Sequence, residues 1–166
     1  MPKRKSQTAE EFVRELDSDP EYLARQLAKD RAVEALAREC AADQSELLAA
    51  LRGLGVQVGS IYDFVNGGGA PPAAVPLLVA HLDEPHHPRI WEGIVRSLSV
   101  RHARDYALPA LKRIYRSEVD PSRRWVIANA IGSMAKLSEV RDLEGIDTHR
   151  ALFRQSRKPP HVRPAL

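Results

Sequence analysis

A repeat with a period of 33 residues constrains the fold of this chain more than any other feature of its sequence. The motif Ala-Val-Pro-Leu-Leu around Pro76 is answered by Ala-Leu-Pro-Ala-Leu around Pro109, 33 positions later. In each copy a second proline, Pro88 or Pro121, precedes another apolar series at the same offset. Proline is tolerated in the first turn of a helix because its missing N–H would have no partner within the helix. The repeated unit is therefore predicted to be a helix, a turn and a second helix.

This unit is similar to a HEAT repeat, in which an outer helix beginning Leu-Pro-x-Leu and a turn with Asp and Pro precede an inner helix with an early arginine. The resemblance covers residues 74–142 and implies an all-α fold, a short right-handed α-solenoid of helical hairpins. HEAT arrays share a fold and a curved binding surface but no chemistry, so the resemblance implies no catalytic residues. The matching residues are Val75-Pro76-Leu77-Leu78, Asp83, Pro85, Arg89 and Gly93 in one copy, and Leu108-Pro109-Ala110-Leu111, Asp120, Pro121, Arg124 and Val126 in the other.

Two hairpins alone would leave apolar faces uncovered at both ends of the stack. We therefore expect the helices before the repeat to form an N-terminal helical cap, and residues 143–153 to form a degenerate helix that covers the other end. Capping motifs predict those first helices at Thr8 with Glu11, Asp19-Pro20, Asp43 with Glu46, and Ser60 with Asp63. The predicted organisation is an N-terminal helical region (1–66), a linker at the triple glycine (67–73), the repeat region (74–153) and a basic, proline-rich tail (154–166).

Composition excludes several classes of protein. Aromatic residues make up only 5% of the chain against 43% hydrophobic residues in all, which favours packed helices over a β-sandwich. The single cysteine, Cys40, rules out an internal disulfide framework and is expected to be a small buried hydrophobe. No long apolar stretch follows Lys3-Arg4-Lys5, so neither a secretory signal nor a membrane span is expected, and the predicted location is cytoplasmic.

Charge is distributed unevenly along the chain. Residues 1–88 hold 9 Lys and Arg against 14 Asp and Glu, whereas residues 89–166 hold 16 against 8. The basic half suits an acidic partner, although the two halves can also neutralise each other, surface helices are commonly basic and tryptophans commonly fill core gaps. The candidate binding surface consists of Arg89, Trp91, Arg96, Lys112, Arg113, Arg116, Arg123, Arg124 and Trp125.

No motif indicates catalysis. The best metal candidate is the turn with His81, Asp83, Glu84, His86 and His87, but its spacing matches no standard ligand set. Such a turn is expected to be solvated and to supply no pocket for a substrate or for a pKa shift, so no catalytic residue, metal or cofactor is predicted. A helix-turn-helix over 46–53 and 60–66 is disfavoured, because the turn is long and the second helix is apolar where base-reading groups are needed.

The sequence therefore predicts a non-enzymatic binding module whose helical-repeat surface grips a partner protein, as an adaptor, a chaperone or an immunity-like inhibitor does. Nucleic-acid binding through the basic C-terminal half is the alternative hypothesis. The identity of the partner and the oligomeric state are not encoded in any motif.

Overall fold

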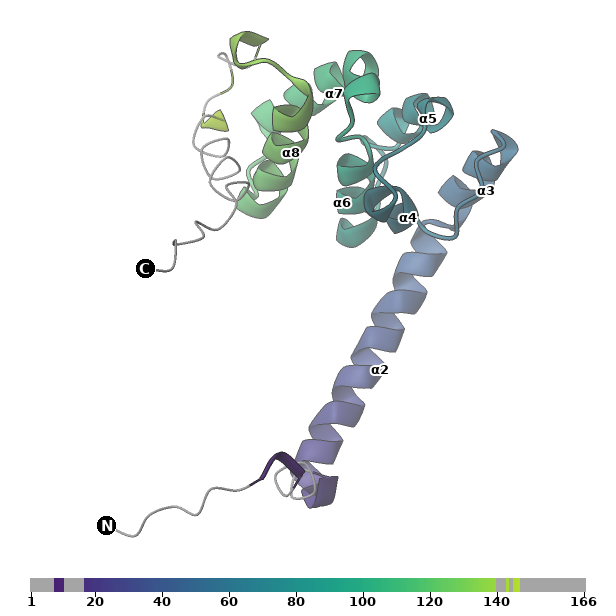
Figure 1. Ribbon diagram of the computed structural model, residues 1–166, viewed down its shortest axis with the longest axis vertical. Helices are drawn as coiled ribbons and strands as arrows, with labels where there is room; N and C mark the ends of the chain where they lie inside the picture. Colours follow the sequence, from purple (N-terminus) through teal and green to yellow (C-terminus); the bar gives the residue numbers. More distant parts are fainter. Residues whose placement is uncertain (1–7, 11–16, 140–142, 144, 147–166) are drawn as a thin grey trace, which may run out of the picture. The chain divides into compact units, whose positions relative to one another are not determined.

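The computed structural model describes residues 8–10, 17–139, 143, 145 and 146. All regular secondary structure in this part of the chain is helical, which confirms the all-α prediction. Short 3-10 turns lie at Pro72–Ala74, Arg101–Ala103 and Leu137–Glu139. The helices are α2 (Pro20–Asp43), α3 (Ser45–Gly53), α4 (Ile61–Asn66), α5 (Val75–Ala80), α6 (Pro88–Ser97), α7 (Arg104–Ser117) and α8 (Pro121–Met134) (Figure 1).

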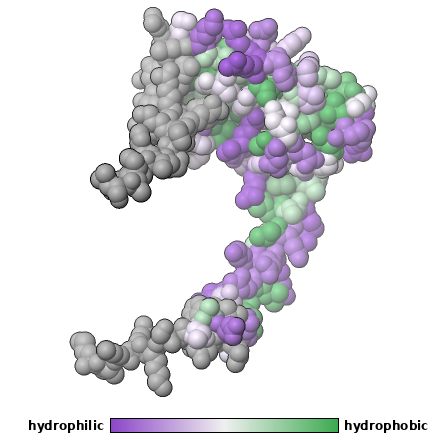
Figure 2. Space-filling model, viewed as in Figure 1, coloured by the Kyte–Doolittle hydropathy of each residue, from purple (hydrophilic) through white to green (hydrophobic). Residues whose placement is uncertain are grey.

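The chain divides into two compact units, Met1–Ala42 and Asp43–Leu166. The division lies ahead of the predicted linker at 67–73, so that α3 and α4 belong to the same unit as the repeat. In the first unit, α2 has no buried residue. Leu23, Leu27 and Val33 are exposed on it, and Figure 2 shows apolar residues among hydrophilic ones along this helix.

Two of the predicted helix starts are confirmed by their hydrogen bonds. The Asp19 carboxylate accepts from the backbone N–H groups of Glu21 and Tyr22, at 2.9 and 3.3 Å, ahead of α2. The Ser60 and Asp63 side chains form a reciprocal capping box at α4. These polar side chains occupy backbone N–H groups that have no partner inside the helix, which is why the helices begin there.

The capping box predicted at Asp43 and Glu46 is wrong. Asp43 is the last residue of α2, and the N-cap of α3 is Gln44, which makes no side-chain cap hydrogen bond. The carboxylate of Asp43 instead binds residues of a distant turn, as described below. The pair Thr8 and Glu11 cannot be compared, because Glu11 lies outside the described residues.

The repeat region folds as two hairpins, α5 with α6 and α7 with α8. The first helices of the two hairpins, α5 and α7, pack together, and the second helices, α6 and α8, pack together, while α4 lies against the other side of α6. Residues 33 positions apart are buried in both hairpins, because each hairpin presents the same faces to its neighbours. These pairs are Ala74 and Ala107, Val75 and Leu108, Leu78 and Leu111, Ile94 and Ile127, and Leu98 and Ile131.

The triple glycine makes a tight connection between α4 and the first hairpin. Gly69 has φ +109°, and a Cβ there would lie 2.0 Å from Cγ1 of Val100, so only glycine fits. The next residue, Ala70, is buried and donates its N–H to the carbonyl of Ser97 at 2.8 Å. The segment is thus packed against the end of α6.

The predicted helix at 143–153 lies outside the described residues except for Leu143, Gly145 and Ile146, and the tail at 154–166 lies outside them entirely. Leu143 and Ile146 are buried. Among the helices that the structure describes, none combines the length and the apolar character needed to cross a membrane.

Candidate functional site

The outward faces of α6 and α8 form one candidate surface. Arg89 and Arg96 are exposed on α6 and Trp125 is exposed on α8, while Glu92 and Asn129 are half-buried between them. Glu92 and Trp125 lie 33 positions apart, as do Arg96 and Asn129, so both hairpins turn the same register positions outward. Because α6 and α8 pack side by side, these five residues, here called the inner-helix surface, lie on neighbouring helices.

Contacts from neighbouring segments hold this surface in place. The hydroxyl of Tyr62 in α4 donates to the carbonyl of Arg89 at 3.0 Å, and Oγ of Ser133 in α8 donates to the carbonyl of Ser99 at 3.0 Å. The Arg96 guanidinium pairs with the Glu92 carboxylate at 2.6 Å, one helical turn earlier. The side chain of Trp125 is 42% exposed, which is high for an aromatic residue in the middle of a packed array.

Trp91 is part of the core rather than of an exposed surface, which corrects its placement among the candidate binding residues. It is 3% exposed, and its indole N–H donates to the carbonyl of Leu82 at 3.2 Å. The Arg123 guanidinium lies over the Trp91 ring, 4.0 Å from its centroid, and pairs with the Glu118 carboxylate at 3.1 Å. The ring is therefore covered by a residue of α8.

Arg124 also serves the fold. Its guanidinium lies 4.2 Å from the centre of the Tyr115 ring and donates to the carbonyls of Tyr115 and Glu118, both at 3.1 Å. These bonds satisfy carbonyl groups at the end of α7, which have no partner inside that helix. Arg124 thus stabilises the turn between α7 and α8.

The basic residues of α7 are largely engaged within the molecule. Arg113 donates to both carboxylate oxygens of Asp83 at 2.9 and 2.6 Å, and Lys112 donates to the carbonyl of Glu139 at 2.6 Å. Arg116 is exposed on the same helix. The positive charge of this helix is therefore partly compensated by the protein itself, which weakens its field toward an acidic ligand.

The histidine turn lines a pocket of about 400 Å³, so the expectation of a solvated turn without a pocket is wrong. The pocket lies among the start of α3, the helix α5 and the turn that joins α5 to α6. Its walls carry both carboxylates and apolar side chains. The lining residues are Asp43, Glu46, Leu47, Leu77, Ala80, His81, Glu84, Pro85 and His86.

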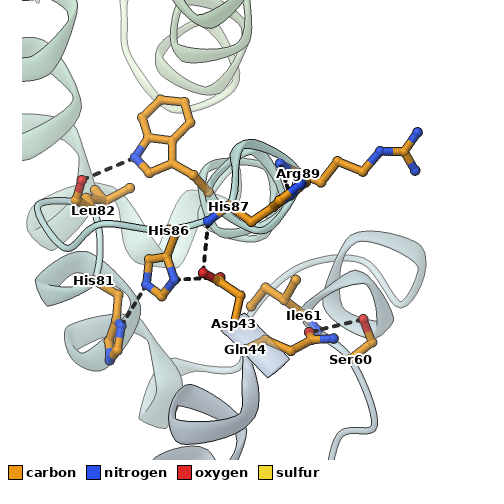
Figure 3. Close-up of polar contacts among 10 residues, drawn as sticks. Asp43, Gln44, Ser60, Ile61, His81, Leu82, His86, His87 and Arg89 are labelled. Atoms are coloured by element: carbon orange, nitrogen blue, oxygen red, sulfur yellow. Dashed lines mark hydrogen bonds and ion pairs between the residues drawn. The ribbon is translucent and has the colours of Figure 1, made fainter. Parts of the chain in front are cut away.

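Three side chains in this pocket form a hydrogen-bonded series, here called the histidine relay (Asp43, His86 and His81). Asp43 Oδ2 lies 2.9 Å from Nδ1 of His86, and Nε2 of His86 lies 3.0 Å from Nδ1 of His81 (Figure 3). The other oxygen of Asp43 accepts from the backbone N–H of His87 at 2.9 Å. The side chain of His86, the middle member, is only 7% exposed.

The residue after Asp43 anchors the same region to α4. Gln44 is buried, and its Oε1 accepts from the backbone N–H of Ile61 at 3.0 Å and from Oγ of Ser60 at 3.3 Å (Figure 3). Two adjacent residues at the start of α3 are thus fixed, one to the turn between α5 and α6 and one to the start of α4.

The local environment shifts the pKa of one member of the relay. Burial and the neighbouring His86 lower the pKa of His81, and the carboxylates of Glu84 and Glu46 raise it by less. No group of three or more His, Cys, Asp or Glu side chains in the described part of the chain is arranged to hold a metal ion. In the relay, nitrogen faces nitrogen at hydrogen-bond distance, an arrangement suited to sharing a proton.

Asp43 was the functional residue that the sequence did not indicate. It lies more than 40 positions before the turn, and its spacing to Glu46 imitated a capping box. A second signal was present for the tryptophans: Trp125 is equivalent to Glu92 in the repeat, whereas Trp91 is equivalent to Arg124, so the two rings had to face different ways.

Comparison with protein-family models, with curated proteins and with solved structures finds no match to this chain.

Proposed function

We propose that this chain is a non-enzymatic binding module that grips a cytoplasmic protein through the inner-helix surface (Arg89, Glu92, Arg96, Trp125 and Asn129). In this proposal α3 with α4, α5 with α6, and α7 with α8 stack as a short, right-handed, HEAT-like solenoid with an N-terminal helical cap. The burial of equivalent residues 33 positions apart supports that arrangement.

The observation that carries the proposal is the exposure of Trp125 on α8. An indole that keeps 42% of its surface in water loses a favourable burial that a partner can supply. Tryptophan and arginine are the residues most enriched at the energetic centres of protein interfaces. Arg96, at the equivalent of Asn129, and Arg89 on α6 flank this ring with groups suited to a polar rim.

The structure gives nucleic acid less support as the ligand. Arg113, Lys112, Arg123 and Arg124 each make contacts within the protein, and using them on phosphates would require breaking those contacts. The test therefore separates the two kinds of partner.

The test is affinity capture of partners from the native lysate with the full chain and with two single variants. Trp125→Ala removes the exposed indole, and Tyr106→Ala removes an exposed aromatic ring of α7, 61% exposed, as the matched control. We expect Trp125→Ala to weaken capture of a specific protein by about 30-fold or more, and Tyr106→Ala to leave it within about threefold.

Equal capture by Trp125→Ala and the unmodified chain would contradict the proposal. Nuclease-sensitive, salt-sensitive retention that persists in Trp125→Ala and is lost when Lys112 and Arg116 are replaced would instead favour nucleic acid.

A further inference from the structure

The chemistry of Asp43 fixes where the protons of the histidine relay lie at neutral pH. An ionised carboxylate only accepts hydrogen bonds, so Nδ1 of His86 carries the proton that points to Asp43. Neutral His86 then has a lone pair on Nε2, which accepts from a protonated Nδ1 of His81. The series runs in one direction: His81 donates to His86, and His86 donates to Asp43.

The relay tolerates one added proton but not two. A first proton on Nε2 of His86 makes this ring a donor on both sides, and the bond persists if His81 shifts its own proton to Nε2. A second proton leaves both facing nitrogens, 3.0 Å apart, bearing hydrogen, so that neither can accept. Two imidazolium rings with centroids 5.2 Å apart also repel each other.

Every charged group around the relay has a defined place. Asp43 lies at the start of the second unit and Glu46 lies on α3, while Glu84 and His87 belong to the turn between α5 and α6. The two glutamates favour protonation of His81, but burial and the adjacent His86 oppose it more strongly. The surroundings therefore hold the relay in its hydrogen-bonded form at neutral pH.

The second hairpin shows that the helical repeat does not need this relay. Ile114 stands at the position equivalent to His81 and is buried, and Val119 stands at the position equivalent to His86 and is 89% exposed. Both hairpins nevertheless cap their second helix, through the His87 ring in one and the Asp120 carboxylate in the other. The histidine relay is therefore a specific feature of the first hairpin.

We propose that the histidine relay is a pH-sensitive latch that fastens the turn between α5 and α6 to the start of α3 at neutral pH and releases it when both imidazoles are protonated. Release frees the wall of the pocket that His81, Glu84 and Pro85 form. It also loosens Asp83 in the same turn, whose carboxylate is held by Arg113 of the next hairpin. The latch thereby couples acidity to the contact between the two hairpins.

The sign of the effect follows from His81. Its pKa is lower in the folded protein than its ordinary value of 6.5, so the open or unfolded chain binds the proton more readily than the latched form. The stabilisation by the latch is therefore fully present above that ordinary value and is lost as the pH falls through the folded pKa. Acidification opens the latch, and a return to neutral pH closes it.

The backbone amide of His87 is a direct reporter, because it donates to Asp43. Hydrogen exchange of the full chain, followed by NMR at about pH 7.5 and about pH 5, gives its protection after correction for the intrinsic exchange rate. We expect protection of the His87 amide to fall on the order of tenfold at the lower pH, the effect of losing about one hydrogen bond to a charged group. The amide of Arg123, which donates to Asp120 in the second hairpin, is the internal control and should not change.

A matched variant, His81→Ile, places in the first hairpin the residue that the second hairpin has there. We expect its His87 amide to show the same protection at both pH values, within about threefold. Constant protection in the unmodified chain, or a loss in His81→Ile as large as in the unmodified chain, would overturn the latch. The unmodified chain decides the question even if the variant does not fold, and neither readout depends on a binding partner.

Discussion

Truncation of Ile127 measures how much the second helix of a hairpin contributes to the core. Ile127 is 0% exposed and equivalent to the buried Ile94 in α6. The change to alanine removes three carbon atoms, a loss of about 2.4 kcal/mol at about 0.8 kcal/mol for each CH₂ group. An uncollapsed cavity of roughly 80 Å³ adds up to about 2 kcal/mol. We therefore expect Ile127→Ala to lower the free energy of unfolding by about 2–4 kcal/mol.

Urea unfolding followed by tryptophan fluorescence is the appropriate assay, since Trp91 and Trp125 both lie in the second unit. Val119→Ala is the control, because that side chain is largely exposed and its truncation should change stability by less than about 0.5 kcal/mol. A loss below about 1 kcal/mol for Ile127→Ala, at an unchanged slope on urea, would refute the inference that this position anchors the core.

Three further predictions concern stability. Gly93→Ala should cost about 1–3 kcal/mol in the same urea assay, because the new Cβ would lie 2.8 Å from Cγ2 of Ile61; an unchanged midpoint would contradict this close packing. Gly53→Ala should be neutral or stabilising by up to about 1 kcal/mol, since no atom lies within 4 Å of a Cβ there and alanine favours the helix; a clear destabilisation would count against it. Asp83→Ala should cost less than about 1 kcal/mol, and the cost should shrink further in high salt, because both partners of the pair with Arg113 are more than half exposed; a large loss that salt does not change would be inconsistent with a surface ion pair.

The sequence alone determined the helical elements and several of their boundaries. Pro88 and Pro121 begin α6 and α8, and the capping residues Asp19 and Ser60 precede α2 and α4, as predicted. These signals succeed because helix starts depend on backbone groups within about four residues of the capping side chain. The equivalence of Ile94 and Ile127 as core residues was likewise readable, since burial along a helix follows its own period.

Only the tertiary structure decided which polar residues act together. Nothing near Asp43 indicates that its carboxylate meets His86, because the contact depends on how α3, α5 and the intervening turn pack. Trp91 and Trp125 looked alike in sequence, yet one register position, about 100° around a helix, places one ring in the core and the other in water. Local hydrogen bonding and helical periodicity are properties of short segments and are encoded there, whereas the meeting of distant side chains is fixed only when whole helices have packed.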